Sequence, residues 1–531
     1  MRTAVHDLVR EAATVHPARP ALTFKGTTVD YASLWAMTRR AGAGLAACGV
    51  ARGQRVAVFL DKRIENVVAM VGASAAAAVF VPVNPVLKAP QVAHILADCD
   101  VTTLVTTAPR LAMLAEEMKA CAALERVVLV GSTHQPGAAL ADVGQPGDAP
   151  YDVLAWEDLL GARTGDLPGP AIDLDVAAIL YTSGSTGKPK GVVLTHRNLL
   201  VGAESVSSYL ANTSDDVILA ALPLSFDAGL SQVTTAFAVG AHVVLLNYLL
   251  PREVVTLCAE HRVTGLTCVP PLWIQIADLD WPEEVAGRLR YFANTGGRMP
   301  RATLDRLRAT FPQARPFLMY GLTEAFRSTY LDPTEVDRRP DSIGKAIPNA
   351  EILVVRPDGT ECAPGEEGEL VHRGGLVALG YWNDPARTAE RFRPAPGTES
   401  EWRAPELAVW SGDSVVRDEE GFLFFVGRKD DMIKTSGYRV SPTEIEEAAY
   451  DSGLVRDAVA LGLDDERLGQ RVVLVATAAQ GGDLDESGLL ATLRRRLPLF
   501  MVPGQVVARE EIPRSPNGKF DRVLLKQELA G

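Results

Sequence analysis

The stretch YTSGSTGKPKGVVLTHRN (residues 181–198) lies directly after the apolar run VAAIL (176–180). Its glycines allow backbone N–H groups to converge on an anion, its hydroxyl groups add hydrogen-bond donors, and Lys188 and Lys190 supply positive charge. This combination between two apolar runs predicts a loop that binds a polyphosphate. The loop differs from a Walker P-loop, because only two residues separate the glycines of GSTG (184–187) and a proline follows the first lysine.

Short apolar or β-branched runs alternate with helical patterns along most of the chain. The runs are RVAVFL (55–60), TTLVTT (102–107), RVVLVG (126–131), HVVLLN (242–247) and GLTCVP (265–270). Between them lie stretches with helical spacing, such as NVVAMVGASAAA and RATLDRLRAT. This alternation predicts an α/β fold in which parallel sheets are flanked by helices.

The pattern changes twice toward the C-terminus. AEILVVRPDGTE, GELVHRG and FLFFVGR predict a small β-rich subdomain over about 343–429. Beyond it, the capped helix start SPTEIEE precedes two strand patterns and the helical stretch DESGLLATLRRRLP. We therefore expect a large N-terminal domain (1–429) and a small α+β C-terminal domain (430–531). The segment 133–150, rich in Gly, Pro and Ala, is expected to be a surface loop.

The composition is that of a globular protein with more than one core. Hydrophobic residues make up 47% and charged residues 22% of the 531 residues. The net charge is −13 and no Lys/Arg run is longer than three residues, so neither nucleic acid nor anionic lipid is an expected partner. The six cysteines have no CxxC or Cys/His metal spacing, which favours reduced thiols over disulfides or zinc.

Two segments bear on export and membrane insertion. Charges interrupt MRTAVHDLVREAATVHP (1–17), which predicts an amphipathic helix rather than a signal peptide. The uncharged run 66–87 is long enough for a spanning helix, but it is mostly Ala, Val and Gly and contains two prolines. This composition favours a buried helix (about 67–77) followed by a buried strand (79–83). We expect a cytoplasmic protein without a membrane span.

The phosphate-loop stretch resembles the signature of the adenylate-forming superfamily, which includes acyl-CoA ligases, luciferases and the adenylation domains of peptide synthetases. Further stretches resemble the remaining signatures in the same order: MYGLTEA (319–325), GELVHRGGLVALGYWNDPART (368–388), WSGDSVV (410–416), GRKDDMIKTSGYRVSPTEIE (427–446) and PRSPNGKFDR (513–522). The resemblance spans nearly the whole chain. It implies an enzyme that activates a carboxylic acid with ATP as acyl-AMP, releases pyrophosphate and passes the acyl group to a thiol.

The resemblance implies nucleotide-binding roles for residues in these stretches. Glu324 would coordinate the Mg²⁺ that accompanies ATP, with Thr186 near the transferred phosphate. Asp413, in a turn after Trp410, would accept hydrogen bonds from the ribose hydroxyls, and Arg428 would hold ribose or phosphate. The other expected nucleotide-binding residues are Thr182, Ser183, Gly184, Ser185, Gly187, Lys190, Gly296, Gly297, Tyr320, Gly321 and Thr323.

Three residues near the C-terminus are implied to act in turn. Lys519, in a Pro-Asn-Gly turn, would reach the substrate carboxylate and the α-phosphate and offset their repulsion during adenylation. Asp430 would be the hinge about which the C-terminal domain rotates, and Lys434 would enter the site after that rotation. The simpler interpretation of Lys519 is an exposed lysine in a turn.

The stretch LPLSFDAGLSQ (222–232) bears on the identity of the acid. It resembles amino-acid-activating domains, in which the Asp of a Phe-Asp pair, here Phe226 and Asp227, holds the substrate ammonium. Arg327 and Ser328 fall where pocket-lining side chains lie in those enzymes, and Arg327 would meet a second carboxylate or carbonyl. The alternatives are local capping or pairing for Asp227 and an internal ion pair for Arg327.

FDAGLSQ and GLTEAFRSTYL together also resemble exosortase-A-associated AMP-ligases and stand-alone adenylation enzymes of natural-product pathways. The expected acceptor is therefore either CoA or the phosphopantetheine thiol of an acyl carrier protein. Three alternatives remain: an ordinary fatty or aryl acyl-CoA synthetase, a luciferase-type oxygenase and an inactive nucleotide-binding regulator. The last would be expected to lack Lys519 or Glu324, and both are present.

Overall fold

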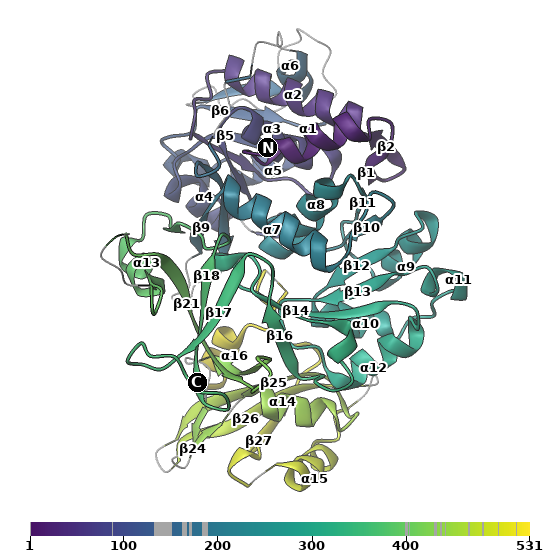
Figure 1. Ribbon diagram of the computed structural model, residues 1–531, viewed down its shortest axis with the longest axis vertical. Coiled ribbons are helices and arrows are strands. Elements are labelled where there is room, and N and C mark those ends of the chain that lie inside the picture. The colour runs from purple at the N-terminus through teal and green to yellow at the C-terminus, as the bar shows by residue number, and fades with distance from the viewer. Residues whose placement is uncertain are drawn as a thin grey trace.

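The computed structural model describes residues 2–87, 89–131, 151–161, 167–168, 172–182, 189–398, 402, 404–428, 433–435, 438–440, 442–465, 468–479, 483–497, 499–516 and 518–530. Its strands form three sheets, with helices packed between and around them (Figure 1). The α/β fold expected from the sequence is confirmed. The loop predicted at 133–150 lies outside the described residues.

The first sheet has eight strands and contains the hairpin of the phosphate-loop stretch. Its order is β19 (Gly380–Tyr381), β9 (Lys190–Thr195), β8 (Val176–Thr182), β4 (Val79–Pro82), β3 (Arg55–Val58), β5 (Val101–Thr106), β6 (Arg126–Leu129) and β7 (Asp152–Ala155). The pairs from β8 through β4, β3, β5 and β6 to β7 are parallel, and β9 and β19 join antiparallel. The strands predicted at 55–60, 102–107 and 126–131 are confirmed as β3, β5 and β6.

The second sheet has fourteen strands and changes character along its length. Its mainly parallel half is β14 (Arg315–Tyr320), β13 (Tyr291–Asn294), β12 (Gly265–Cys268), β10 (Val217–Ala220), β11 (His242–Leu245), β1 (Pro20–Phe24) and β2 (Thr27–Asp30). Antiparallel strands continue from β14 as β15 (Thr329–Leu331), β16 (Ser342–Ala346), β22 (Leu423–Arg428), β21 (Leu407–Arg417), β18 (Glu367–Gly374) and β17 (Ala350–Val355), with β20 (Phe392–Pro394) on β21. The β-rich stretch therefore extends the large sheet.

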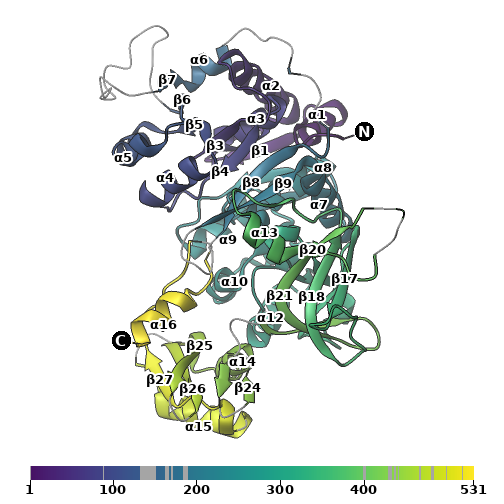
Figure 2. The same cartoon turned by 90° about the vertical axis from the view of Figure 1, so that its left-hand side faces the viewer.

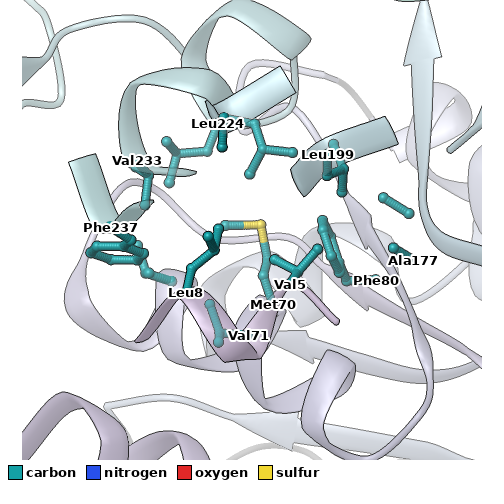
Figure 3. Close-up of a cluster of buried hydrophobic side chains, with 14 of the residues drawn as sticks. Val5, Leu8, Met70, Val71, Phe80, Ala177, Leu199, Leu224, Val233 and Phe237 are labelled. Atoms are coloured by element: carbon teal, nitrogen blue, oxygen red, sulfur yellow. The ribbon is translucent and has the colours of Figure 1, made fainter. Parts of the chain in front are cut away.

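Four helices pack between these two sheets and form the largest core. They are α1 (His6–Val15), α3 (Ile64–Ala75), α7 (His196–Tyr209) and α8 (Asp227–Val239). Figure 3 shows Leu8, Met70, Leu199 and Phe237 from these helices in one buried cluster with Phe80 of the neighbouring strand β4. All residues of α3 after Glu65 are buried, which explains why the helical part of the uncharged run, 66–75, carries no charge. Within the described ranges, none of the helices combines the length and apolar character that a bilayer crossing needs.

The remaining helices of this part surround the sheets, and the longest of them, α2 (Tyr31–Ala47), adds Leu34 and Leu45 to the largest core. The other α-helices are α4 (Ala89–Asp98), α5 (Ala108–Leu114), α6 (Trp156–Gly161), α9 (Pro251–Glu260), α10 (Pro270–Ala277), α11 (Glu283–Ala286), α12 (Arg301–Thr310) and α13 (Pro385–Arg391). Three 3₁₀ turns cover Glu117–Ala120, Thr323–Ala325 and Pro333–Glu335.

The C-terminal elements form a separate five-stranded sheet below the others (Figures 1 and 2). Its order is β24 (Tyr438–Val440), β23 (Ile433–Thr435), β26 (Gly469–Ala478) and β25 (Val455–Asp465), with β27 (Gln505–Ala508) on β26. Helices α14 (Pro442–Tyr450), α15 (Glu486–Arg496) and α16 (Arg522–Ala530) accompany it, with a 3₁₀ turn at Leu499–Met501. An ion pair between Arg298 and Glu447 (3.3 Å) connects this part to the large sheet region.

Candidate active site

Strands β8 and β9 form an antiparallel hairpin whose connection is the predicted phosphate loop. Thr182, the last residue of β8, is the register partner of Lys190, the first residue of β9. The Thr182 hydroxyl is buried and has no hydrogen-bond partner among the described residues. An orphaned hydroxyl at this position fits a site that a polar ligand or the loop itself completes. The other predicted loop residues lie outside the described residues: Ser183, Gly184, Ser185, Thr186 and Gly187.

Lys190, Glu324 and Tyr381 meet in one hydrogen-bonded cluster beside this hairpin. The Lys190 ammonium donates to Oε1 of Glu324 at 3.0 Å and to the Tyr381 hydroxyl at 2.7 Å. The Tyr381 hydroxyl donates to the same Oε1 at 2.6 Å. The Lys190 and Glu324 side chains are 17% and 10% exposed, so this ion pair is largely shielded from water. The cluster places one cation and one anion at the base of the predicted phosphate loop.

Glu324 is held in its ionised form. Burial on its own would raise the pKa of Glu324, but the Lys190 charge and the Tyr381 hydrogen bond lower the pKa to about 2. An ionised carboxylate oxygen suits Mg²⁺, which usually takes one or two protein carboxylates together with phosphate oxygens and water. The donor chemistry of Glu324 therefore fits the expected metal. In the described part of the chain, no group of three or more His, Cys, Asp or Glu side chains forms a dedicated metal site.

Tyr381 reaches the cluster because β19 pairs with β9, although the two strands are far apart in sequence. On one side, the N–H of Ala378 donates to the main-chain carbonyl of Glu324 at 2.9 Å. On the other, the Trp382 indole donates to the carbonyl of Asp98 at the end of α4, at 3.0 Å. Hydrogen bonds on both sides of β19 therefore hold this short strand in place, and with it the position of the Tyr381 hydroxyl.

Asp413 lies within strand β21, so the expected turn is wrong. The strand is locally irregular at this point. Gly412 has a φ of +71°, and the pairing of β21 with β22 shifts register just after Asp413. A glycine in such an irregularity gives the same sequence pattern as a turn. Asp413 is only 2% exposed, and the Tyr320 hydroxyl donates to its Oδ2. Arg428 is the register partner of Asp413 at the end of β22. The structure thus brings two expected nucleotide-binding residues, Tyr320 and Asp413, into direct contact.

The expected nucleotide-binding glycines follow the carboxyl ends of the parallel strands β13 and β14. Gly296 has a φ of +77°, which favours glycine, and the Gly297 carbonyl accepts a hydrogen bond from the Asn294 amide at 2.7 Å. A Cβ atom on Gly321 would lie 3.1 Å from the Cα of Arg327, so two segments pass closely there. Ligands of open α/β sheets bind outside these strand ends.

Asp227 is the first residue of α8 and faces the segment that follows β14. The Thr323 hydroxyl donates to Oδ1 of Asp227 at 3.3 Å, and Nη1 of Arg327 lies 3.8 Å from Oδ2. The same Nη1 donates to the Thr295 hydroxyl at 2.7 Å. Asp227 and Arg327 therefore form an ion pair that is too long for a direct hydrogen bond. Phe226, half-buried, precedes α8 in an extended conformation.

A tight turn at Phe326 sets the direction of Arg327. Phe326 has φ +56° and ψ −56°, and the Arg327 N–H donates to the Ala325 carbonyl at 2.5 Å. This is the geometry of the strained form of the γ-turn. The Phe326 ring is fully buried and packs so closely on Gly202 that a Cβ atom there would lie 2.5 Å from the ring. Packing of this ring therefore holds the strained turn in place.

Ser328 contacts a buried histidine that the sequence did not single out. Its Oγ lies 2.8 Å from Nδ1 of His372 in β18, and both residues are 0% exposed. Burial lowers the pKa of His372 to about 3, and its Nε2 has no partner among the described residues. His372 is therefore a neutral polar neighbour of Ser328 at physiological pH, not an acid or a base.

The loop that carries Lys519 contacts the N-terminal part of the protein. The Asn84 amide donates to the Pro516 carbonyl at 2.9 Å, and Figure 2 shows the chain before α16 extending toward the large domain. The Lys519 side chain is exposed. Asp430 lies outside the described residues, and Lys434 is described only as a backbone position in β23.

Three contacts of this site were not predicted from the sequence: those of Tyr381, Thr295 and His372. Tyr381 and His372 lie within the stretch 368–388, which resembles a family signature. The resemblance therefore identified this stretch as part of the site, but it did not single out these two residues. Thr295 directly follows β13 and carries no such signal. Thr295 belongs to the site because its hydroxyl accepts a hydrogen bond from Arg327, which lies in the segment between β14 and β15.

Residues 9–382 match the family described as AMP-binding enzyme, and residues 444–519 match its AMP-binding enzyme C-terminal domain. The L-proline--[L-prolyl-carrier protein] ligase of Pseudomonas fluorescens is 30% identical over 99% of this chain and 99% of its own. A long-chain-fatty-acid--CoA ligase of Salmonella typhimurium is 29% identical over 99% of this chain and 94% of its own.

Solved structures show the same fold. ATP-bound MatB from Rhodopseudomonas palustris superposes with a TM-score of 0.84 at 25% identity, covering 99% of each chain. The apo form of MatB, with the same identity and coverage, gives a TM-score of 0.74. The chain is therefore more similar overall to the ATP-bound form.

Proposed function

The chain belongs to the AMP-binding enzyme family, and we propose that it is an AMP-forming ligase that joins a carboxylic acid to a thiol. In the first half-reaction, a carboxylate oxygen attacks the α-phosphorus of ATP, and the bond from that phosphorus to the leaving pyrophosphate oxygen breaks. The product is an acyl-adenylate. In the second half-reaction, a thiolate sulfur attacks the acyl carbonyl carbon and AMP leaves.

The Lys190–Glu324–Tyr381 cluster is the observation that carries this proposal. Lys190 stands at the exit of the phosphate loop, where its ammonium can meet phosphate oxygens. Glu324 offers an ionised oxygen to Mg²⁺, and this metal, when bound, neutralises phosphate charge. Tyr381 binds both side chains and orients them. Such an arrangement suits a triphosphate better than an uncharged ligand.

The nucleoside is proposed to lie between the ends of β13 and β14 and strand β21. Asp413 would accept the ribose hydroxyls, with Tyr320 beside it and the main chain of Gly296, Gly297 and Gly321 close by. Glycines allow close approach of a ligand to the backbone. Arg428 is proposed to hold ribose or phosphate from the adjacent strand.

The placement of the C-terminal part supports a role for Lys519 in the first half-reaction. The Asn84–Pro516 hydrogen bond docks its loop on the large domain, and the chain agrees better with the ATP-bound form of MatB. We propose that the C-terminal domain then rotates about Asp430 and presents Lys434 for the thiol step. Such a rotation lets one site use different groups in its two half-reactions.

An amino or amino-like acid is the favoured substrate, because Asp227 offers a partly shielded carboxylate that suits an ammonium. The similarity to a prolyl-carrier protein ligase supports this choice and a phosphopantetheine acceptor. CoA remains the alternative acceptor, and a fatty or aryl acyl-CoA synthetase the alternative function, because a fatty-acid–CoA ligase is almost as similar. The six cysteines are free thiols, which supports the proposed cytoplasmic location.

Exchange of radiolabelled pyrophosphate into ATP, screened over amino, fatty and aromatic acids, tests the proposal. We expect exchange that depends on one class of acid and that Glu324→Gln abolishes. Glu116→Gln, which changes an exposed glutamate (82% exposed), should leave exchange intact. Exchange with none of the acids, or full exchange in Glu324→Gln, would overturn the proposal. CoA and a phosphopantetheinylated carrier protein, offered in parallel, then identify the acceptor.

A further inference from the structure

A cavity of about 20 Å³ is lined by Arg327 and by Ala228, the residue that follows Asp227 in α8. Residues of α7, α8 and strands β10, β12, β13 and β14 line it. The α8 wall consists of Ala228, Ser231, Gln232 and Thr235, which fall on one side of the helix because they follow the helical spacing i, i+3, i+4, i+7. Among the described residues that line the cavity, Arg327 is the charged one.

The Gln232 amide in this wall is already satisfied by the scaffold. Its Nε2 donates to the carbonyls of Leu219 (3.1 Å) and Thr267 (3.0 Å), and its Oε1 accepts from the Leu222 N–H (3.1 Å). It therefore ties α8 to strands β10 and β12 and has little capacity left for a ligand. A ligand in this cavity must be recognised by another group.

Arg327 is that group. Its side chain is 3% exposed, yet the described residues account for one hydrogen bond, to Thr295, and for the 3.8 Å approach to Asp227. Its buried Nε has no partner among the described residues. A guanidinium has five N–H donors, and buried donors are normally paired. The unpaired Nε therefore indicates that a hydrogen-bond acceptor completes the site.

The substrate itself can supply this acceptor. When a substrate ammonium binds Asp227, the negative charge of this carboxylate is shared between the ammonium and the Arg327 guanidinium. A second group on the same substrate that carries an oxygen atom can then pair with Arg327, and the lone pairs of this oxygen accept a hydrogen bond from Nε. An acid without such a group leaves a buried, half-paired guanidinium, which is costly.

We infer that the acid is a small α-amino acid whose short side chain carries an oxygen acceptor bound by Arg327. This inference rests on the proposed function and narrows its substrate class. A cavity of about 20 Å³ holds a group about the size of a water molecule. It accommodates the oxygen atom of a hydroxyl, carboxamide or carboxylate close to the Cα atom, as in serine, asparagine or aspartate. A long alkyl chain or an aromatic ring exceeds it.

The first test is pyrophosphate exchange by the wild-type protein with serine, asparagine, aspartate, alanine, valine, octanoate and benzoate. We expect at least one of the first three acids to exceed alanine and valine in kcat/KM by roughly tenfold or more, because a site built for hydrogen bonding rejects analogues that lack the group. A preference for alanine, valine, octanoate or benzoate overturns this inference and leaves the proposed function standing. Exchange with none of the acids contradicts both.

Two variants test the residue assignment. Arg327→Met keeps the side-chain length and removes the donors, so it should reduce the preference over alanine to about threefold or less and leave the KM for ATP unchanged. Arg197→Met, which changes an exposed arginine paired with Asp173, is the matched control and should keep the preference. If Arg327→Met does not fold, Ala228→Leu fills the cavity and should likewise remove the preference. Undiminished preference in either cavity variant overturns the inference.

Discussion

Replacing Lys190 by Met removes one partner of the buried Lys190–Glu324 pair and keeps a side chain of similar length. In the wild-type protein, the pKa of Glu324 is about 2, against an ordinary value of 4.5, because the Lys190 charge and the Tyr381 hydrogen bond outweigh burial. The variant keeps the hydrogen bond from Tyr381 (2.6 Å) but leaves the carboxylate without the lysine charge. Burial then opposes its ionisation.

The size of the expected loss follows from this pKa. A pKa that folding lowers from 4.5 to about 2 contributes about 3 kcal/mol to the free energy of unfolding. The contribution is fully present above pH 4.5, and it disappears as the pH falls toward 2, because the unfolded chain takes up the proton first. Because the Lys190 charge is the largest of the causes that lower this pKa, we expect Lys190→Met to lose a large part of these ~3 kcal/mol at pH 7, with a smaller loss at acid pH.

Equilibrium urea unfolding at pH 7 and at about pH 3.5, followed by tryptophan fluorescence, measures both differences. Lys119→Met is the matched control: Lys119 pairs with Glu116 at 2.7 Å, but the side chains are 71% and 82% exposed. Its loss should stay below about 0.5 kcal/mol at both pH values. Equal losses in the two variants at pH 7, or a Lys190→Met loss that does not shrink at acid pH, would refute the assignment of a buried, ionised Glu324.

The remaining predictions concern other parts of the site. Lys519→Ala should abolish pyrophosphate exchange but retain thioester formation from acyl-AMP, and Lys434→Ala should do the reverse; an equal fall in both half-reactions would argue against a rotating domain. Asp413→Asn should raise the KM for ATP by roughly tenfold, because a charged acceptor of the ribose hydroxyls is lost; an unchanged KM would place the ribose elsewhere. Gly202→Ala should lower the free energy of unfolding by about 1–3 kcal/mol, measured by urea unfolding, because its Cβ atom would clash with the Phe326 ring. A neutral change would show that the turn at Phe326 yields easily.

Local patterns in the sequence predicted the elements of the fold well. HVVLLN and GLTCVP form β11 and β12, and RATLDRLRAT forms α12, because the spacing of apolar residues is a property of each segment alone. The uncharged run 66–87 forms most of α3 and all of β4. It needs no charged residues there, because a helix buried on all sides and a strand between parallel neighbours have no exposed face.

Contacts between distant segments were less accessible from the sequence. Tyr381 joins Lys190 and Glu324 only because β19 adds to β9, and nothing near either residue specifies that pairing. Asp413 was expected in a turn after Trp410, whereas Gly412 produces an irregularity inside a long strand. The half-paired state of Arg327 depends on Thr295 and Asp227, which reach it from two other strand connections.

Transfer of ¹⁸O from the substrate carboxylate tests the central claim most directly, because the claim is that this carboxylate attacks the α-phosphorus of ATP. The preferred acid, labelled in its carboxylate, is incubated with ATP, magnesium and the thiol acceptor, and the nucleotide products are analysed by mass spectrometry. The proposed chemistry predicts AMP that carries one labelled oxygen, together with unlabelled pyrophosphate. ADP with labelled phosphate, or AMP without label, would contradict it.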